Sequence, residues 1–392
     1  MKLPRRRFLQ MAAGAAALHA VSRTASAQAY PTKPIRWIIG FPAGGGADTV
    51  ARIMEPWLSR QLGQPVIIEN RSGASTNIAV QAVVNSPPDG YTLLWHGLSS
   101  VVNASLFTNL PFDIQRDIDP AAGVVSYPMI MVAHPSVPAK SVAELIAHAK
   151  ANPGKVTMAS FGTGSASHLA GELFKFMAGI DMVHIPYRGG APMTTDLIAG
   201  QVQVGFDVMV TALPQVRSGK LRALGVLGAK RFDLLPDVQT VAETVPGYEA
   251  STWAGVGVPR GTPPEIIERL NREVNAGLAQ PDIRARLADV GTVPMVLSAA
   301  AFKAYIAGGE VGQGCKDRGH QAAVRQLQRT GYSVTSVGQM GSDQQNCTFG
   351  QSTDVRFRTN RTSTRHRRMT GSAPTWTSAP LTGCKLSAIP AD

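Results

Sequence analysis

Three loops combine glycine with serine, threonine or proline, each just after an apolar run and just before an amphipathic one. They span residues 41–48, 161–168 and 187–191. A loop of this kind exposes the unpaired N–H groups of a helix start, and glycine lets a ligand approach the backbone closely. The chemistry that this pattern favours is the binding of an anionic oxygen, not the making or breaking of a bond.

The same loops restrict which anion is expected. The run Gly44-Gly45-Gly46 is not followed by the Lys-Ser/Thr of a phosphate-binding P-loop, and Gly162-Thr163-Gly164 does not form a G-x-G-x-x-G. Arg188 is the only cation in the three loops. A carboxylate held by backbone amides, hydroxyl groups and bridging water fits better than a phosphate.

An exported hydrolase is the competing interpretation, with Ser165 as nucleophile and His168 as base. No G-x-S-x-G surrounds this serine, and Ser165 also suits a helix cap. The histidines before residue 309 form no H-E-x-x-H, so no metal or other cofactor is expected. Asp207 follows an apolar run and could either accept hydrogen bonds from a ligand or cap the next helix, whereas Asp48 is interpreted as a helix cap. We expect a binding protein, not an enzyme.

The elements that position these loops alternate between strand and helix. Strands are expected at 35–39, 66–69 and 91–95, a strand at 129–133 begins a second α/β set, and a strand at 251–258 returns to the first. Trp37, Trp95 and Trp253 occupy core-like strand positions and are interpreted as packing. Alternation of this kind predicts mainly parallel sheets. One α/β lobe inserted into another gives two chain crossings and a cleft that closes by hinge motion.

Charge and cysteine content exclude other classes of protein. The chain of 392 residues has a net charge of +12, but residues 1–27 contribute +5, residues 309–392 contribute +6 and residues 28–308 only +1. The nearly neutral body offers no basic groove for nucleic acid. All three cysteines lie after residue 314, so the body has no disulfide and no thiolate metal site.

Both ends of the chain differ from the body. Residues 1–27 contain a twin-arginine motif, a short apolar run and the cleavage-type sequence Ala25-Ser26-Ala27, and predict an export signal that is removed in the periplasm. Residues 309–392 are rich in Gly, Ser, Thr, Gln and Arg. We interpret them as a frameshift product, because a one-nucleotide shift can restore an amphipathic helix there, or as a disordered tail.

Ordered motifs across residues 30–308 resemble the Bug family, the extracytoplasmic receptors of tripartite tricarboxylate transporters. The motifs are Phe41–Asp48, Glu69–Ala74, Asp89–Leu94, Gly162–Phe174 without residues 166 and 167, Pro186–Pro192, Gly200–Val202 and Phe206-Asp207.

This resemblance implies a two-lobed, Venus-flytrap α/β fold of the type II periplasmic-binding-protein class. Lobe 1 would comprise residues 28–130 and 251–308, and lobe 2 residues 131–250. The receptor would act as a monomer and deliver its ligand to membrane permease subunits. A sensor that passes the signal to a kinase would have the same sequence features. The implied ligand-binding residues are Phe41, Ala43, Gly44, Gly45, Ser75 and Ser99 on one side and Gly162, Thr163, Ser165, His168, Arg188 and Asp207 on the other.

Overall fold

The computed structural model describes residues 30–107 and 109–307. The signal sequence expected at residues 1–27 and the altered stretch expected at residues 309–392 lie outside this range. Within the described residues, no helix is both long and apolar enough to cross a membrane.

The first lobe is built on a sheet whose parallel part comes from the N-terminal segment. Strand β1 (Ile35–Ile39) pairs in parallel with β2 (Val66–Asn70) on one side and with β3 (Thr92–Gly97) on the other. Strand β9 (Ser251–Pro259) then pairs antiparallel with β3. The strand predicted at 251–258 is therefore confirmed, and it lies at the centre of this sheet.

The second lobe repeats the parallel arrangement. Strand β5 (Thr157–Ser160) lies between β6 (Val183–Pro186) and β7 (Val204–Val208), and both pairings are parallel. Strand β4 (Ile118–Ala133) pairs antiparallel with β7 and with β8 (Arg222–Val226). The expected parallel pairing thus holds within each lobe, but antiparallel strands make both sheets mixed.

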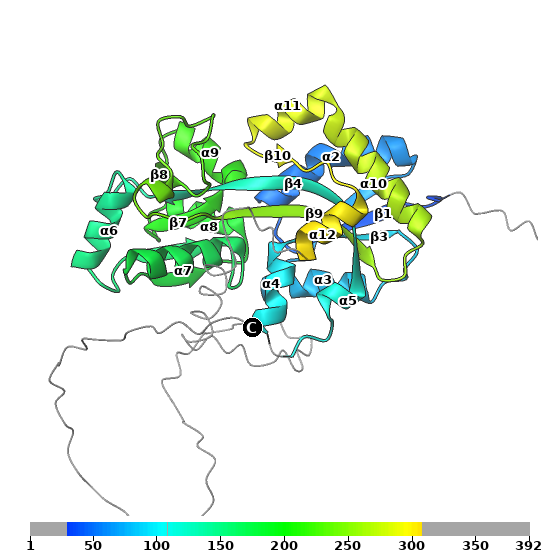
Figure 1. Cartoon of the computed structure of the whole chain (residues 1–392), viewed down its shortest axis with the longest axis horizontal. Coiled ribbons are helices and arrows are strands. Elements are labelled where there is room, and N and C mark those ends of the chain that lie inside the picture. The colour runs from blue at the N-terminus through cyan, green and yellow to red at the C-terminus, as the bar shows by residue number, and fades with distance from the viewer. Residues whose placement is uncertain (1–29, 108, 308–392) are drawn as a thin grey trace, which may run out of the picture. The chain divides into compact units, whose positions relative to one another are not determined.

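Strands β4 and β9 run side by side through both lobes (Figure 1). The sequence predicted only residues 129–133 of β4, which was wrong in extent. Pro120, Gly123 and Pro128 interrupt the apolar pattern before residue 129, and the register with β9 shifts on either side of Ala122. Proline and glycine weaken a strand signal because they mark edges and irregularities, yet here pairing with β9 keeps this segment extended.

Helices cover the sheets, and two of them begin at glycine loops. The longest is α2 (Gly46–Leu62), which follows β1, and α7 (Ala166–Ala178) follows β5. Both helices end at a glycine in the left-handed region, Gly63 and Gly179. The remaining elements are η1 (Ala74–Thr76), α3 (Asn77–Val84), α4 (Leu98–Leu106), α5 (Ile114–Asp117), α6 (Val142–Ala151), α8 (Gly190–Ile198), α9 (Met209–Arg217), η2 (Val241–Glu243), α10 (Pro264–Ala279), α11 (Pro281–Asp289), β10 (Val293–Pro294) and α12 (Ala299–Ala307).

The last described helix is fixed to the centre of the first lobe. Phe302 of α12 is fully buried, and its ring lies 5.5 Å from that of Trp253 on β9 in an edge-to-face arrangement. A methyl group on Gly255 would come within 2.3 Å of the Phe302 ring, so this close approach needs a glycine. The helix therefore supports a strand that also lines the site described next.

Candidate functional site

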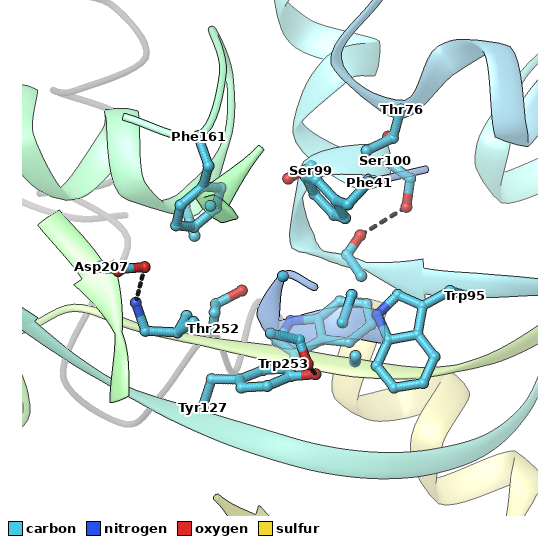
Figure 2. A pocket seen from close by; sticks show the side chains of 18 residues that line it. Phe41, Thr76, Trp95, Ser99, Ser100, Tyr127, Phe161, Asp207, Thr252 and Trp253 are labelled. Atoms are coloured by element: carbon cyan, nitrogen blue, oxygen red, sulfur yellow. Dashed lines mark hydrogen bonds between the residues drawn. The ribbon is translucent and has the colours of Figure 1, made fainter. Parts of the chain in front are cut away.

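A cavity lies where the two lobes meet, above the paired strands β4 and β9 (Figure 2). It holds about 660 Å³ of space free of protein atoms, its open mouth included. A concave wall that is mainly apolar, with a few polar groups, is typical of a site for a small molecule. Its lining comprises Phe41, Gly45, Gly46, Ala47, Thr76, Trp95, Gly97, Ser99, Ser100, Tyr127, Phe161, Ala166, Gly190, Asp207, Val208, Thr252, Trp253 and Ala254.

The start of α2 faces this cavity from the first lobe. Gly45 is the residue before the helix, and no side chain caps the helix there. Within the described residues, the backbone N–H groups of Gly45, Gly46 and Ala47 donate to no protein acceptor. Such groups at the start of a long helix carry about half a positive charge and attract anions. The cavity therefore has an electropositive end without any basic side chain.

Asp48 holds the loop before α2 in shape. The interpretation of Asp48 as the helix cap was wrong, because α2 begins two residues earlier and Asp48 lies in its first turn. Its Oδ2 accepts hydrogen bonds from the Gly44 N–H at 3.0 Å and from Arg52 Nε at 2.9 Å. Burial alone would raise the pKa of Asp48, but the hydrogen bonds from Arg52 and Gly44 lower it below its usual value. Asp48 is thus an ionised brace for the loop.

Thr76 adds a hydroxyl group at the same end. The residue is 8% exposed and lines the cavity, and within the described residues its Oγ1 has no hydrogen-bond partner. Ala74, Ser75 and Thr76 all have positive φ angles, of 43°, 54° and 76°. Residues other than glycine rarely adopt this region, and strained backbone of this kind gathers at binding sites. The strained segment thus contributes Thr76 to the cavity wall, with the Thr76 hydroxyl itself buried.

Asp207 is the charged residue of the opposite wall. It is fully buried, and its carboxylate accepts hydrogen bonds from the Val208 N–H (2.8 Å), Thr211 Oγ1 (2.7 Å) and Thr194 Oγ1 (3.3 Å). Burial raises the pKa of Asp207 to about 6, although these hydrogen bonds oppose the shift. Helix α9 begins after Val208 without a side-chain cap. Asp207 thus both lines the cavity and holds the residue that precedes α9.

Aromatic rings form much of the remaining wall, and the sequence did not identify them all. Trp95 and Trp253 were interpreted as packing, and they do pack, but both also line the cavity together with Tyr127. Phe41 and Phe161 come from opposite lobes, and their ring centroids lie 6.1 Å apart, edge to face. The alternating pattern of a strand indicates which side chains are buried, but not whether they pack on protein or border a cavity.

The structure brings only part of the expected set to the cavity. Phe41, Gly45, Ser99 and Asp207 line it. The others do not: Ala43 and Arg188 are exposed, and Gly44 borders a separate hollow between α2, α8 and α9. The loop before α7 contains Gly162, Thr163 and Ser165, and Ser75 contacts this loop. His168 is fully buried and does not line the cavity.

The proposed catalytic pair is not assembled. Ser165 Oγ donates to the Gly162 carbonyl oxygen at 2.6 Å and accepts from the His168 backbone N–H at 3.3 Å, which is a helix cap. His168 Nδ1 accepts from the Gly164 N–H at 3.1 Å, and its ring stacks on that of His184 at 3.8 Å. Burial lowers the pKa of His168 well below its usual value. Within residues 30–107 and 109–307, Ser165 Oγ therefore has no contact with a basic side chain of the kind that nucleophilic catalysis needs.

Metal binding also finds no support in the described part of the chain. Among residues 30–107 and 109–307, no three His, Cys, Asp or Glu side chains gather in a way that could hold a metal ion. With the catalytic pair and a metal site set aside, the candidate site is the cavity between the lobes.

Direct contacts join the two lobes around the cavity mouth. Ser75 Oγ donates to the Thr163 carbonyl oxygen at 2.6 Å. A methyl group on Gly189 would come within 2.4 Å of Pro42, and one on Gly46 within 2.9 Å of Val208. These contacts place the lobes in a closed arrangement.

Comparison with known proteins gives concordant matches. Residues 50–312 match the family described as tripartite tricarboxylate transporter family receptor. Protein BugT of Bordetella pertussis is 37% identical over 290 residues, which cover 73% of this chain and 89% of BugT.

Two solved structures share the fold. One, R. palustris Rpa4515 with adipate, is 33% identical with a TM-score of 0.71, covering 77% of this chain and 98% of that chain. The other, MatC from Rhodopseudomonas palustris with bound malate, is 29% identical with a TM-score of 0.68, covering 76% and 99%.

Proposed function

This chain belongs to the tripartite tricarboxylate transporter receptor family, and on that premise we propose that it captures one small carboxylated compound in the periplasm. The family consists of solute-binding receptors, not enzymes, so the hydrolase alternative is set aside. The captured compound is then delivered to the membrane permease subunits of the transporter. Relatives whose structures contain adipate and malate support a carboxylate as the ligand.

One observation carries the proposal: the start of α2 opens into the cavity between the lobes. The N–H groups of residues 45–47, which have no protein acceptor within the described residues, would donate hydrogen bonds to a carboxylate. Preorganised donors in a protein cavity bind an anion more strongly than they would in bulk water.

The ligand-binding residues that we propose are those that reach the cavity. From the original set these are Phe41, Gly45, Ser99 and Asp207, to which Gly46, Ala47, Thr76, Trp95, Tyr127, Phe161 and Trp253 are added. Ser75, Thr163 and Ser165 are assigned a supporting role, because their hydrogen bonds shape the loops and join the lobes.

Further features of the proposal concern export and lobe boundaries. We assign residues 1–27 to a twin-arginine signal that directs the folded receptor to the periplasm. Lobe 1 comprises residues 28–130 with 251–308, and lobe 2 comprises residues 131–250. The receptor acts as a monomer, as one complete cavity per chain requires no second copy.

Binding of carboxylates against matched neutral compounds tests this function. Thermal shift and calorimetry would compare carboxylic acids, adipate and malate included, with the corresponding primary amides. We expect one carboxylate per chain to bind and to raise the melting temperature, while its amide does not. Folded protein that binds no carboxylate, or binds acid and amide equally, would contradict the proposal.

A further inference from the structure

The walls of the cavity are dominated by aromatic rings that are fixed before any ligand arrives. The five rings belong to Phe41, Trp95, Tyr127, Phe161 and Trp253. Trp95 packs on Trp37 with centroids 5.1 Å apart, and Trp253 is held edge to face by Phe302 at 5.5 Å. A rigid ring pays little conformational entropy when it contacts a ligand. The cavity is therefore preorganised for a flat, apolar body.

The polar group of Tyr127 is already used within the protein. Its hydroxyl donates to the Gly46 carbonyl oxygen at 3.3 Å, and burial raises the pKa of Tyr127 well above its usual value. The phenol stays neutral. Ser100 is similarly engaged, because its hydroxyl donates to the Gly97 carbonyl oxygen at 2.6 Å and contacts His96 Nδ1 at 2.9 Å. Both residues offer the ligand mainly apolar surface.

Charge is distributed unevenly between the two ends of the cavity, the start of α2 and Asp207. Among the described residues that line the cavity there is no Lys, Arg or His, and Asp207 is the charged side chain. The start of α2 can receive one carboxylate. A second carboxylate on the ligand would meet aromatic rings or the Asp207 carboxylate, and an unpaired buried charge is strongly unfavourable.

Asp207 has capacity for one more hydrogen bond. A carboxylate offers about four acceptor positions. Among the described residues, Val208 and Thr211 donate to Oδ1, and Thr194 alone donates to Oδ2. Figure 2 shows Asp207 on the lobe that carries Phe161, across the cavity from Ser99 and Thr76. A hydroxyl or amino group on the far end of a ligand would complete its hydrogen bonds.

We infer that the ligand is an aromatic monocarboxylate with a hydrogen-bond donor opposite its carboxylate. The carboxylate lies at the α2 start, the ring lies among the five aromatic side chains, and the donor binds Asp207. This inference rests on the proposed function and narrows its substrate class. The dicarboxylates named for the relatives fit the cavity less well, because the second charge has no partner.

A panel of matched acids tests the inference on the full chain by titration calorimetry. The panel comprises 4-hydroxybenzoate, benzoate, hexanoate, terephthalate, adipate and malate. We expect 4-hydroxybenzoate to bind most tightly, about tenfold better than benzoate, in line with one added hydrogen bond to a charged group. Terephthalate, which has the same ring and a second carboxylate, should bind at least tenfold more weakly than benzoate.

Two variants connect the order of affinities to the named side chains. Asp207→Asn should reduce the preference for 4-hydroxybenzoate over benzoate to about twofold or less. Phe161→Leu should weaken benzoate more than hexanoate, because a ring contact is lost. Phe176→Leu is the control, since Phe176 lies on α7 of the same lobe, is 56% exposed and does not line the cavity.

The outcomes separate this inference from the proposed function. Tighter binding of terephthalate, adipate or malate than of 4-hydroxybenzoate would overturn the aromatic monocarboxylate and leave a carboxylate receptor. Equal affinities across the panel, or an unchanged preference in both variants, would overturn it as well. Absence of binding by every acid to folded protein would overturn the proposed function too.

Discussion

Ser75 Oγ donates a hydrogen bond to the carbonyl oxygen of Thr163 at 2.6 Å, which joins the loop before α3 to the loop before α7. The two residues belong to different lobes, and Ser75 has a positive φ of 54°. Asn103 Nδ2 donates to the Ser75 carbonyl oxygen at 2.6 Å and fixes this conformation from α4. Because the Ser75 hydroxyl and its acceptor belong to different lobes, this contact requires the two lobes to lie close together.

Removal of this contact should weaken ligand binding. Ser75→Ala deletes the donor and leaves the Thr163 carbonyl to water, so the closed form loses a hydrogen bond of about 1 kcal/mol, or about fivefold in affinity. The change should appear mainly in the rate of ligand dissociation, measured by stopped-flow fluorescence. Ser136→Ala serves as the control, because Ser136 is an exposed residue of the second lobe away from the cavity. An unchanged dissociation rate in Ser75→Ala would show that the contact does not stabilise closure.

A side chain at Gly45 should block the anion without unfolding the protein. Gly45 has a φ of −83°, and a methyl group there meets only the Pro42 carbonyl oxygen, at 3.5 Å. Gly45→Val should therefore keep its melting temperature within a few degrees while affinity falls by at least tenfold, because the side chain covers the N–H groups that face the cavity.

Gly228→Val is the matched control for this substitution. A methyl group on Gly228 has 3.9 Å to its nearest neighbour, Lys230, and the residue does not line the cavity. Normal affinity in Gly45→Val would mean that the ligand does not approach the α2 start.

The stability of the protein should fall as the pH drops below about 6.5. Burial lowers the pKa of His96 to about 4 and that of His184 to about 3, from 6.5. The unfolded chain then binds protons that the folded protein excludes, so their stabilising contribution is complete above pH 6.5 and is lost as pH falls toward 4 and 3. Asp207 has the opposite effect on stability. Its pKa is raised from 3.8 to about 6, so below about pH 6 the folded protein binds a proton more readily than the unfolded chain and is stabilised by it.

Denaturant midpoints at pH 7.5 and pH 5 measure this balance. The stability lost through two histidines exceeds the stability gained through one aspartate, so the denaturant midpoint should be lower at pH 5 than at pH 7.5. Asp207→Asn removes the opposing contribution and should make the decrease larger. A midpoint that rises between pH 7.5 and pH 5 would contradict the assignment of these buried histidines as neutral.

Truncation of Phe302 should destabilise the first lobe and disturb the cavity floor. Phe302→Ala leaves a void beside Trp253 and Gly255, and such a change typically costs 3–5 kcal/mol. Chemical denaturation would measure the loss, and Trp253 fluorescence would report the altered surroundings of the ring. The exposed Phe176→Ala should cost less than about 1 kcal/mol. Equal losses in the two variants would show that α12 is not part of the core.

Local sequence was sufficient to predict the loops but not the complete site. A strand followed by glycine and a helix is a local pattern, and it marked the segment 41–48, of which Phe41 and Gly45 line the cavity; Asp207, which also lines it, was noted for its place after an apolar run. His168 lies close to one of these loops in sequence, yet the first turn of α7 carries it into the core. Neighbours along a helix point in different directions, so a position in a motif does not fix the direction of a side chain.

The missed part of the site depends on contacts between distant segments. Trp253 belongs to β9 and Tyr127 to β4, and they share a surface only because residues 251–259 pair with residues 118–128. Apolar periodicity reports burial of each strand separately. Which buried rings border a cavity is decided when the strands assemble, and no local signal in either segment indicates it.

A ligand-bound crystal structure tests the central claim most directly, with the tightest-binding carboxylate of the panel. We expect a carboxylate oxygen within about 3.2 Å of at least one N–H among residues 45–47, with the rest of the ligand between the two lobes. A carboxylate bound elsewhere, with these N–H groups occupied by water or by protein atoms, would contradict the account.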